Sequence, residues 1–189
     1  MDLISVLKMI KFNVASINKC TEVEGPFKRL CIWFQGCNIQ CVGWCNPDYQ
    51  ALVPKIRFSL DELIDIIKES QKEFGIEGVN FLGGEPSLQQ NLPKLTRKIK
   101  ELGLGVISFT GRIYEEVKDC FVGCDVVIDG VYKQDEQDTQ RRIIGSKNQR
   151  VICLTERYKN CIDTWFNNSK TKTMEVGLAD KIVINGDAF

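Results

Sequence analysis

The alternation of apolar strand segments with amphipathic helices constrains the fold of this chain more than any other sequence feature. Short apolar runs predict strands at residues 30–35, 79–82, 104–109 and 125–129, and helices are predicted between them at 60–74, 92–102 and 113–121. Ser59 and Glu62 form a capping box that marks the start of the first helix. Strand–helix alternation with short connections requires a mostly parallel sheet, so the sequence predicts an α/β fold.

The length of 189 residues suits one domain with a real core. We find no internal repeat, low-complexity tract or Pro/Gly-rich linker, which predicts a single domain over residues 1–189, with its regular part at about 11–154. Residues 36–58 are predicted to form a loop. The last third is less regular, with strands indicated at 150–154 and 181–184.

Charge and hydropathy narrow the range of partners. Lys plus Arg equals Asp plus Glu, 25 each, so no net field favours nucleic acid or an acidic membrane, and we expect neither as a partner. No run approaches the roughly 18 consecutive apolar residues of a membrane helix. The start, MDLISVLKMIKF, makes a poor signal peptide, so a cytoplasmic location is expected.

Three of the nine cysteines stand in one loop, directly after a predicted strand: Cys37, Cys41 and Cys45. Three thiolates so spaced can hold three irons of a 4Fe–4S cubane and leave the fourth iron open to a substrate group. The alternatives are a zinc site completed by a distant cysteine, or three free thiols. Histidine is absent, which excludes His-containing zinc sites and the commonest general base.

The sequence GGEP, beginning at Gly83, follows the next predicted strand. Carboxyl ends of parallel strands gather at one edge of a sheet, so this turn should lie beside the cysteine loop. Gly83 and Gly84 permit close approach of the backbone to a ligand, and Glu85 offers a negative charge suited to an ammonium group. The simpler reading is a tight strand-to-helix turn.

On these residues the chain resembles the radical S-adenosylmethionine enzymes, through a cluster motif and a motif for the amino group of S-adenosylmethionine. It is most similar to the activating proteins of anaerobic ribonucleotide reductase, which are glycyl-radical activases. Four further pieces match in order: VEGPFKRLCIWFQGC (23–37), SFTGRIYEEV (108–117), DVVIDGVY (125–132) and IGSKNQRVI (144–152).

The family usually has two residues between its second and third cysteines, whereas this chain has three, Val42, Gly43 and Trp44. Trp44 keeps the aromatic position before the third cysteine. We interpret the extra residue as an insertion near Gly43, where glycine can absorb a local bulge.

The resemblance implies a partial (βα) barrel that binds a 4Fe–4S cluster and S-adenosylmethionine and generates a deoxyadenosyl radical. Cys37, Cys41 and Cys45 would ligate the cluster. Further cofactor contacts would come from Gly83, Gly84, Glu85, Thr110 and Asp129, although for the last two a turn or cap hydrogen bond is an equal alternative. The implied partners are a glycyl-radical enzyme, anaerobic ribonucleotide reductase first, and an electron donor such as flavodoxin or ferredoxin.

Two other functions stay open from the sequence: a radical enzyme for a small molecule or peptide, and a non-catalytic iron–sulfur or zinc protein. A second metal could be held by Cys120 and Cys124 with Cys153 or Cys161. Trp33 and Phe34 are interpreted as core. The polar residues 134–150 form either a solvated loop or a partner surface, in which residues 145–150 (GSKNQR) would contribute Lys147 and Arg150.

Overall fold

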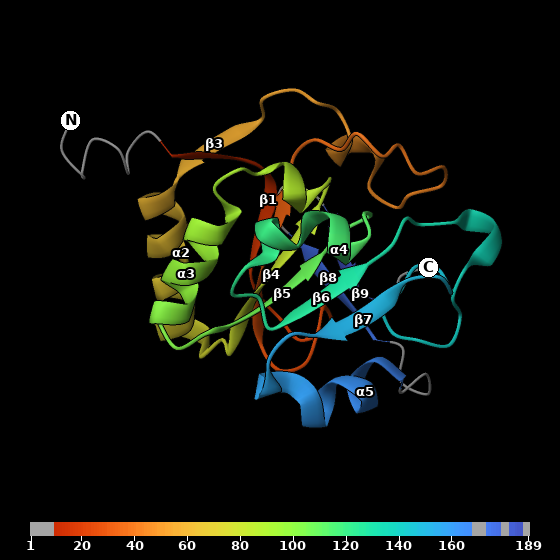
Figure 1. Ribbon diagram of the computed structural model, residues 1–189. Coiled ribbons are helices and arrows are strands. Elements are labelled where there is room, and N and C mark those ends of the chain that lie inside the picture. The colour runs from red at the N-terminus through yellow and green to blue at the C-terminus, as the bar shows by residue number, and fades with distance from the viewer. Residues whose placement is uncertain (1–9, 168–172, 179–181, 187–189) are drawn as a thin grey trace.

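The predicted alternation forms one seven-stranded sheet in the computed structural model, which describes residues 10–167, 173–178 and 182–186 (Figure 1). The strand order is β3-β1-β2-β4-β5-β6-β7. The strands are β1 (Lys11–Thr21), β2 (Arg29–Phe34), β3 (Ile56–Ser59), β4 (Gly78–Gly83), β5 (Gly105–Phe109), β6 (Val126–Asp129) and β7 (Arg150–Cys153). The central strands β2, β4, β5 and β6 run parallel, while β1, β3 and β7 pair antiparallel at the edges. This open sheet confirms the predicted α/β fold class and is consistent with a partial barrel.

Two helices cover one face of the sheet (Figure 1). These two are α2 (Leu60–Phe74) and α3 (Leu92–Glu101), and the described residues also form α4 (Tyr114–Val117) and α5 (Lys159–Asn167). Glu62 N–H donates to Ser59 Oγ at 3.3 Å and Glu62 Oε2 accepts from Ser59 N–H at 2.6 Å, so the predicted capping box is confirmed. The apolar faces of α2 and α3 pack on the strands in the largest core, which anchors the sheet from one side.

Strand β2 shows how the sheet separates core from site. Leu30, Ile32 and Phe34 point into the core beneath α2 and α3, whereas Cys31 and Trp33 point to the other face. Alternate residues of a strand lie on opposite faces, although every residue of β2 is buried. Phe34 and Trp33 are therefore both core as predicted, and Trp33 belongs to a smaller core cluster on the face that also lines the cavity.

The amino ends of the strands are tied together by a buried arginine. Arg29 is fully buried and donates to Tyr158 Oη at 2.9 Å and to Glu77 Oε2 at 3.2 Å. Its guanidinium also lies 5.1 Å from the centre of the Tyr158 ring. Because Tyr158 immediately precedes α5, these contacts fasten α5 to β2 and β4 at the end of the sheet away from the cavity.

Several elements differ from the sequence prediction. Strands β1 and β3 were not predicted, and β3 occupies the last residues of the predicted loop 36–58. The predicted helix 113–121 is α4 followed by a 3-10 turn at Lys118–Phe121. The predicted strand at 150–154 is β7.

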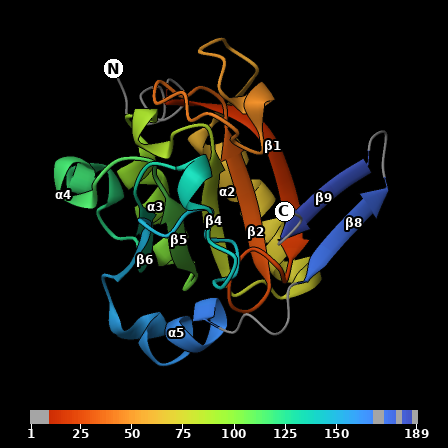
Figure 2. The same cartoon turned by 90° about the vertical axis from the view of Figure 1, so that its right-hand side faces the viewer.

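The second predicted C-terminal strand, 181–184, overlaps β9 (Ile182–Gly186), and residue 181 lies outside the described residues. Its partner β8 (Met174–Leu178) was not predicted. The β8–β9 hairpin reaches the connection between β1 and β2, where Gly186 N–H donates to Glu24 at 2.9 Å (Figure 2). Within the residues that the structure describes, no helix is long and apolar enough to cross a bilayer.

Candidate functional site

A cavity of about 500 Å³ opens at the carboxyl ends of the parallel strands. The loops that follow β2, β4, β5 and β6 contribute to its wall. Predicted residues in this wall are Cys37, Cys41, Cys45, Gly83, Gly84, Glu85 and Thr110. The topology thus brings together residues from three separate motifs, as a parallel sheet requires.

The cysteine loop is closed at its base by main-chain hydrogen bonds. Gly36 N–H donates to Tyr49 O at 2.8 Å, and Cys37 N–H donates to Gln50 O at 2.9 Å. The Gln35 side chain adds a bond from Nε2 to Ala51 O at 2.8 Å. Beyond these bonds the loop reaches the surface, where Val42 is 78% exposed. The base of the loop is therefore fixed to the sheet, and its tip is largely free of it.

The three thiols line the cavity without converging on one point. In the described ranges, 10–167, 173–178 and 182–186, no three His, Cys, Asp or Glu side chains are placed to hold a metal ion. Burial raises the pKa of Cys41. Cys45 is exposed by surface area, yet desolvation by surrounding protein atoms raises its pKa to about 11. Cluster binding would therefore displace protons from these thiols and draw the loop together.

The donor set fits an iron–sulfur cluster. Three thiols of one loop face one cavity, and thiolates are the ligands that iron–sulfur clusters take. Gly43, beside the extra residue of the motif, has a φ of 73°, and a Cβ there would lie 2.6 Å from Gln134 Oε1. The Trp44 ring meets the Tyr132 ring edge-on, with centroids 5.6 Å apart. Gly43 and Trp44 thus lie against the loop that follows β6, while Val42 points to solvent.

The GGE turn lies directly against the cysteine loop. Gly84 N–H donates to Phe34 O at 2.9 Å and Glu85 N–H donates to Gly36 O at 2.8 Å. A Cβ on Gly84 would lie 2.2 Å from Gly36 O, and one on Gly83 would lie 2.5 Å from Phe34 N. Both glycines are required because the backbones of the two loops approach this closely.

Glu85 is fully buried and its carboxylate joins the ends of two strands. It accepts from Thr110 Oγ1 at 2.7 Å, from Gly111 N–H at 2.9 Å and from Ser87 N–H at 3.0 Å. These three donors satisfy the charge without a cationic side chain. Because Glu85 and Thr110 also line the cavity, the turn presents a rigid, negatively charged wall.

Asp129 is the one predicted site residue that is absent from the cavity wall. Its buried carboxylate accepts from Tyr114 N–H at 2.7 Å and from Arg150 Nε at 2.9 Å. Arg150 also donates to Glu115 at 2.8 Å, and these carboxylates hold the pKa of Arg150 above its usual range. The group fastens β6 to β7 and to the start of α4. The Arg150 side chain therefore has carboxylate partners within the fold, whereas Lys147 is an exposed residue whose main-chain N–H donates to Glu136 O.

Sequence reasoning missed the part of the cavity wall that residues 134–149 supply. Arg141 lines the cavity, donating to Asp138 Oδ2 at 2.6 Å and to Gln149 O at 2.8 Å. Gln149 in turn donates to Gly130 O at 3.1 Å. These residues are polar and show no period, so no sequence signal indicates that they fold back over the strand ends.

The remaining cysteines give the second-metal hypothesis no support among the described residues. Cys124 is buried, and desolvation raises its pKa to about 12. Cys120 donates to Ser87 O at 3.6 Å, and Cys161 donates to Tyr158 O at 3.4 Å. Cys153 is exposed on β7. These thiols are spread over different elements and serve packing or local hydrogen bonds.

Three cysteines on one loop at the carboxyl end of an open α/β sheet are typical of proteins that bind an iron–sulfur cluster. The chain belongs to the family described as 4Fe-4S single cluster domain, whose model matches residues 23–152.

Curated relatives include the pyruvate formate-lyase-activating enzymes of Staphylococcus aureus strains USA300 and N315. Each is 26% identical over 156 residues, which covers 76% of this chain. The chain spans 62% of the length of these relatives. A solved structure, QueE from Escherichia coli, matches with a TM-score of 0.49 and 16% identity, covering 58% of this chain and 57% of that one. The family model and the activating-enzyme relatives confirm the resemblance to radical S-adenosylmethionine enzymes, and with it the two predicted cofactors, the 4Fe–4S cluster and S-adenosylmethionine.

Proposed function

We propose that this protein is an activase that uses a 4Fe–4S cluster and S-adenosylmethionine to install a glycyl radical on a partner enzyme. One observation carries the proposal: the three cysteines of one loop and the GGE turn share the wall of a single cavity. When bound, the two cofactors supply reductive cleavage of the sulfonium bond and abstraction of a hydrogen atom from the target. Such chemistry requires no general base, which agrees with the absence of histidine.

Each wall of the cavity has its own task in this proposal. Cys37, Cys41 and Cys45 hold the cluster. The main-chain N–H groups of Gly84 and Glu85 bond within the protein and hold the turn, whose oxygen atoms are the proposed partners of the amino group of S-adenosylmethionine. An ammonium ion is a donor only, which makes carbonyl and carboxylate oxygens its matching partners.

Thr110 is proposed as a positioning residue. Its hydroxyl donates to Glu85 and accepts from Arg112 N–H at 3.1 Å, so it fixes the carboxylate at the edge of the cavity. Asp129 stays a predicted cofactor contact. Its bonds to Tyr114 and Arg150 support a role in positioning the loop after β6 instead.

A protein substrate is supported by the outer rim of the cavity. Cys45 and Gly43 are exposed, and Val42 between the second and third cysteines presents an apolar side chain to solvent. A chain segment of another protein could reach the cavity over this rim. Anaerobic ribonucleotide reductase is the first partner to test, and pyruvate formate-lyase is the second because the curated relatives are named for it. Flavodoxin and ferredoxin are the proposed electron donors.

A radical enzyme acting on a small molecule or peptide is the alternative. Residues 134–149 fold over part of the cavity and place Arg141 and Gln149 in its wall, as a pocket for a small anionic substrate would require. A non-catalytic iron–sulfur protein is the weaker third option, because it leaves the GGE turn without a use.

The deciding experiment supplies the anaerobically reconstituted protein with dithionite, S-adenosylmethionine and each candidate glycyl-radical enzyme in turn. We expect deoxyadenosine as a product and a doublet glycyl signal in the electron paramagnetic resonance spectrum of the partner. A partner in which the target glycine is replaced by alanine is the matched control. Deoxyadenosine without any glycyl signal would favour the small-molecule alternative, and a reduced cluster that is indifferent to S-adenosylmethionine would favour the non-catalytic one.

A further inference from the structure

Residues 51–57 (ALVPKIR) form a continuous exposed surface on the outer side of the cysteine loop, which we name the loop-back surface. Its apolar side chains are unusually open to solvent: Leu52 is 67% exposed, Val53 54% and Ile56 47%. Adjacent exposed apolar residues are typical of a surface that another molecule covers.

The loop-back surface is held in place by hydrogen bonds to its main chain. Asn13 Nδ2 donates to Val53 O at 2.9 Å, and Asn13 Oδ1 accepts from Lys55 N–H at 2.8 Å. The bond from Gln35 Nε2 to Ala51 O holds the first residue of the segment. Because the backbone polar groups face the protein, the apolar side chains are directed outward by a fixed backbone.

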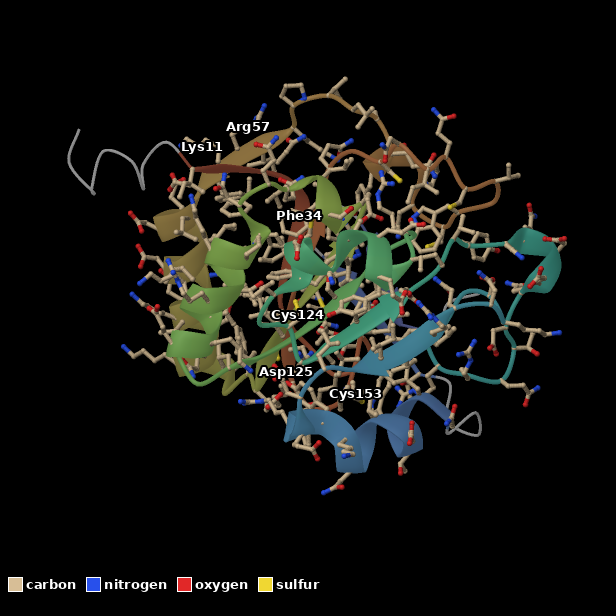
Figure 3. The ribbon with its side chains drawn as sticks, viewed as in Figure 1. Lys11, Phe34, Arg57, Cys124, Asp125 and Cys153 are labelled. Atoms are coloured by element: carbon tan, nitrogen blue, oxygen red, sulfur yellow. The ribbon has the colours of Figure 1, made fainter. Side chains whose placement is uncertain are left out.

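The charged side chains within the loop-back surface have one sign. Lys55 and Arg57 lie within it, and Lys11 of β1 is exposed next to it. Lys11 pairs with Ser59, and Arg57 pairs with Asn13, so Lys11 and Arg57 are diagonal neighbours on one face of the β1–β3 pair (Figure 3). The sequence from residue 49 to 60 contains no carboxylate, and the exposed carboxylates Asp48, Asp61 and Glu62 flank it, with Glu62 close enough to Lys11 to interact with its charge.

The position of this surface separates it from the mouth of the cavity. None of residues 51–57 lines the cavity. Leu52 nevertheless packs against Gly36, since a Cβ on Gly36 would lie 3.2 Å from Leu52 Cδ2, and Gly36 precedes the first cysteine of the motif. A molecule on the loop-back surface would therefore lie close to the cysteine loop on the side away from the cavity, and the cavity would stay open to the substrate.

We propose that the loop-back surface docks a protein one-electron carrier whose own docking face is acidic. This inference rests on the proposed function, because it assigns the entry point of the electron that the cleavage requires. One electron leaves the reduced cofactor of the carrier and is taken up by the oxidised cluster, and no bond forms or breaks in that step. An apolar centre with a cationic rim suits such a carrier, since weak electron-transfer encounters use small interfaces and charge steers their association. The glycyl-radical partner, by contrast, must insert a segment into the cavity.

The test compares the cluster-loaded wild type with the double variant Lys55→Glu/Arg57→Glu and with Leu52→Ser. Photoreduced flavodoxin and reduced ferredoxin serve as separate probes, and bleaching of the cluster absorption gives the rate of reduction without requiring any turnover. For at least one probe we expect the double variant to be reduced about tenfold more slowly at low salt, with a smaller loss in Leu52→Ser, and the difference should shrink as salt rises. Binding of the oxidised probe should weaken in parallel.

Lys72→Glu is the matched control, because Lys72 is an exposed lysine in the last turn of α2, at the opposite end of that helix from β3. Reduction by dithionite and dithionite-driven cleavage of S-adenosylmethionine should be the same in all variants. Equal rates with both carriers in the double variant and the wild type would overturn the docking proposal, as would weaker binding of the glycyl-radical partner with unchanged carrier binding. If dithionite-driven cleavage fails in the wild type, the proposed function fails, while carrier-driven bleaching still decides the docking proposal.

Discussion

The two halves of the cavity wall are built in opposite ways. On one side is the GGE turn, in which the buried Glu85 carboxylate accepts hydrogen bonds from Thr110, Ser87 and Gly111. On the other side, the cysteine loop is bonded at its base and exposed toward its tip, with thiols that do not converge. The first half is held by hydrogen bonds of the protein, and the second is the half in which the proposed cluster would bind.

This difference indicates which half of the cavity wall would depend on the metal for its geometry. A hydrogen-bonded turn between two strands keeps its geometry with or without cofactor, because the folded sheet already orders it and no further loss of entropy is needed. A loop of thiols gains its final geometry from the metal–ligand bonds themselves. The two halves meet where Glu85 N–H bonds to Gly36 O, so the rigid turn determines where the loop begins.

Replacing the thiols should give the largest effect. Cys37→Ala, Cys41→Ala and Cys45→Ala should each abolish a stable cluster, because a cubane held by three protein thiolates cannot lose one of them. Iron and sulfide analysis and the visible absorption of the reconstituted protein measure the result. Cys20→Ala, a half-buried thiol of β1, is the control and should retain about four irons. A full cluster in Cys45→Ala would mean that the third ligand is assigned wrongly.

Gly84→Ala should give the next largest effect, because it disturbs the contact between the two halves of the cavity wall. The added Cβ would lie 2.2 Å from Gly36 O, a main-chain atom that cannot move aside cheaply. We expect a loss of about 2–3 kcal/mol in the free energy of unfolding of the cluster-free protein, measured with denaturant, and a lower cluster yield.

Gly75→Ala is the control for the conformational cost of glycine. It has a φ of 66° and open space around its Cβ position, so it should cost about 1 kcal/mol and leave the cluster yield unchanged. Equal behaviour of the two variants would show that the backbones do not approach as closely as the structure indicates.

Glu85→Gln tests the assembled half with little change of shape. Three donors would then face a neutral amide, which should lower the free energy of unfolding by about 1–2 kcal/mol. The cluster should form normally, while the effect of S-adenosylmethionine on its electron paramagnetic resonance spectrum should weaken. Thr110→Val should produce the same pattern to a smaller degree. Loss of the cluster itself in Glu85→Gln would contradict the separation of the two halves.

The smallest expected effects concern Arg150 and Lys147, two cations that the sequence placed together in a possible partner surface. Arg150→Glu removes the cationic partner of the buried Asp129 and places a second carboxylate beside it, so it should lower the free energy of unfolding. Lys147→Glu should change it by less than about 0.5 kcal/mol. Only Lys147 can therefore report on partner binding, through the yield of the glycyl signal relative to deoxyadenosine. Equal stability of both variants would refute the structural role of Arg150.

The sequence predicts those elements whose signals are local. The capping box at Ser59 and the periodic apolar residues of α2 are enough to define that helix. Strand β1 was missed because its apolar residues alternate irregularly with polar ones, and two register shifts in its pairing with β2 show why. Such a strand is determined by its neighbour more than by its own residues.

The site follows the same division. Cys37 to Cys45 and Gly83 to Glu85 could be placed together because parallel topology brings strand ends to one edge. Arg141 and Gln149 could not, since their places in the cavity wall depend on hydrogen bonds between residues of an aperiodic loop. Asp129 was chosen for its place at a strand end, but the end of a strand does not determine which way its last side chain points.

The closed base of the cysteine loop has a consequence for how such a motif can change in length. Because Gly36 bonds to Tyr49 and Cys37 bonds to Gln50, residues 38–48 begin and end at the same two points whatever their number. Lengthening a closed loop costs little chain entropy, only about 0.6 kcal/mol for a doubling. An added residue beside Gly43 therefore leaves the sheet and the GGE turn undisturbed. The backbone at the tip of the loop must then adjust so that the three thiols keep their spacing. On this architecture, a change in the spacing of the second and third cysteines leaves the sheet and the GGE turn in place and alters only the contacts of the tip with the loop that follows β6.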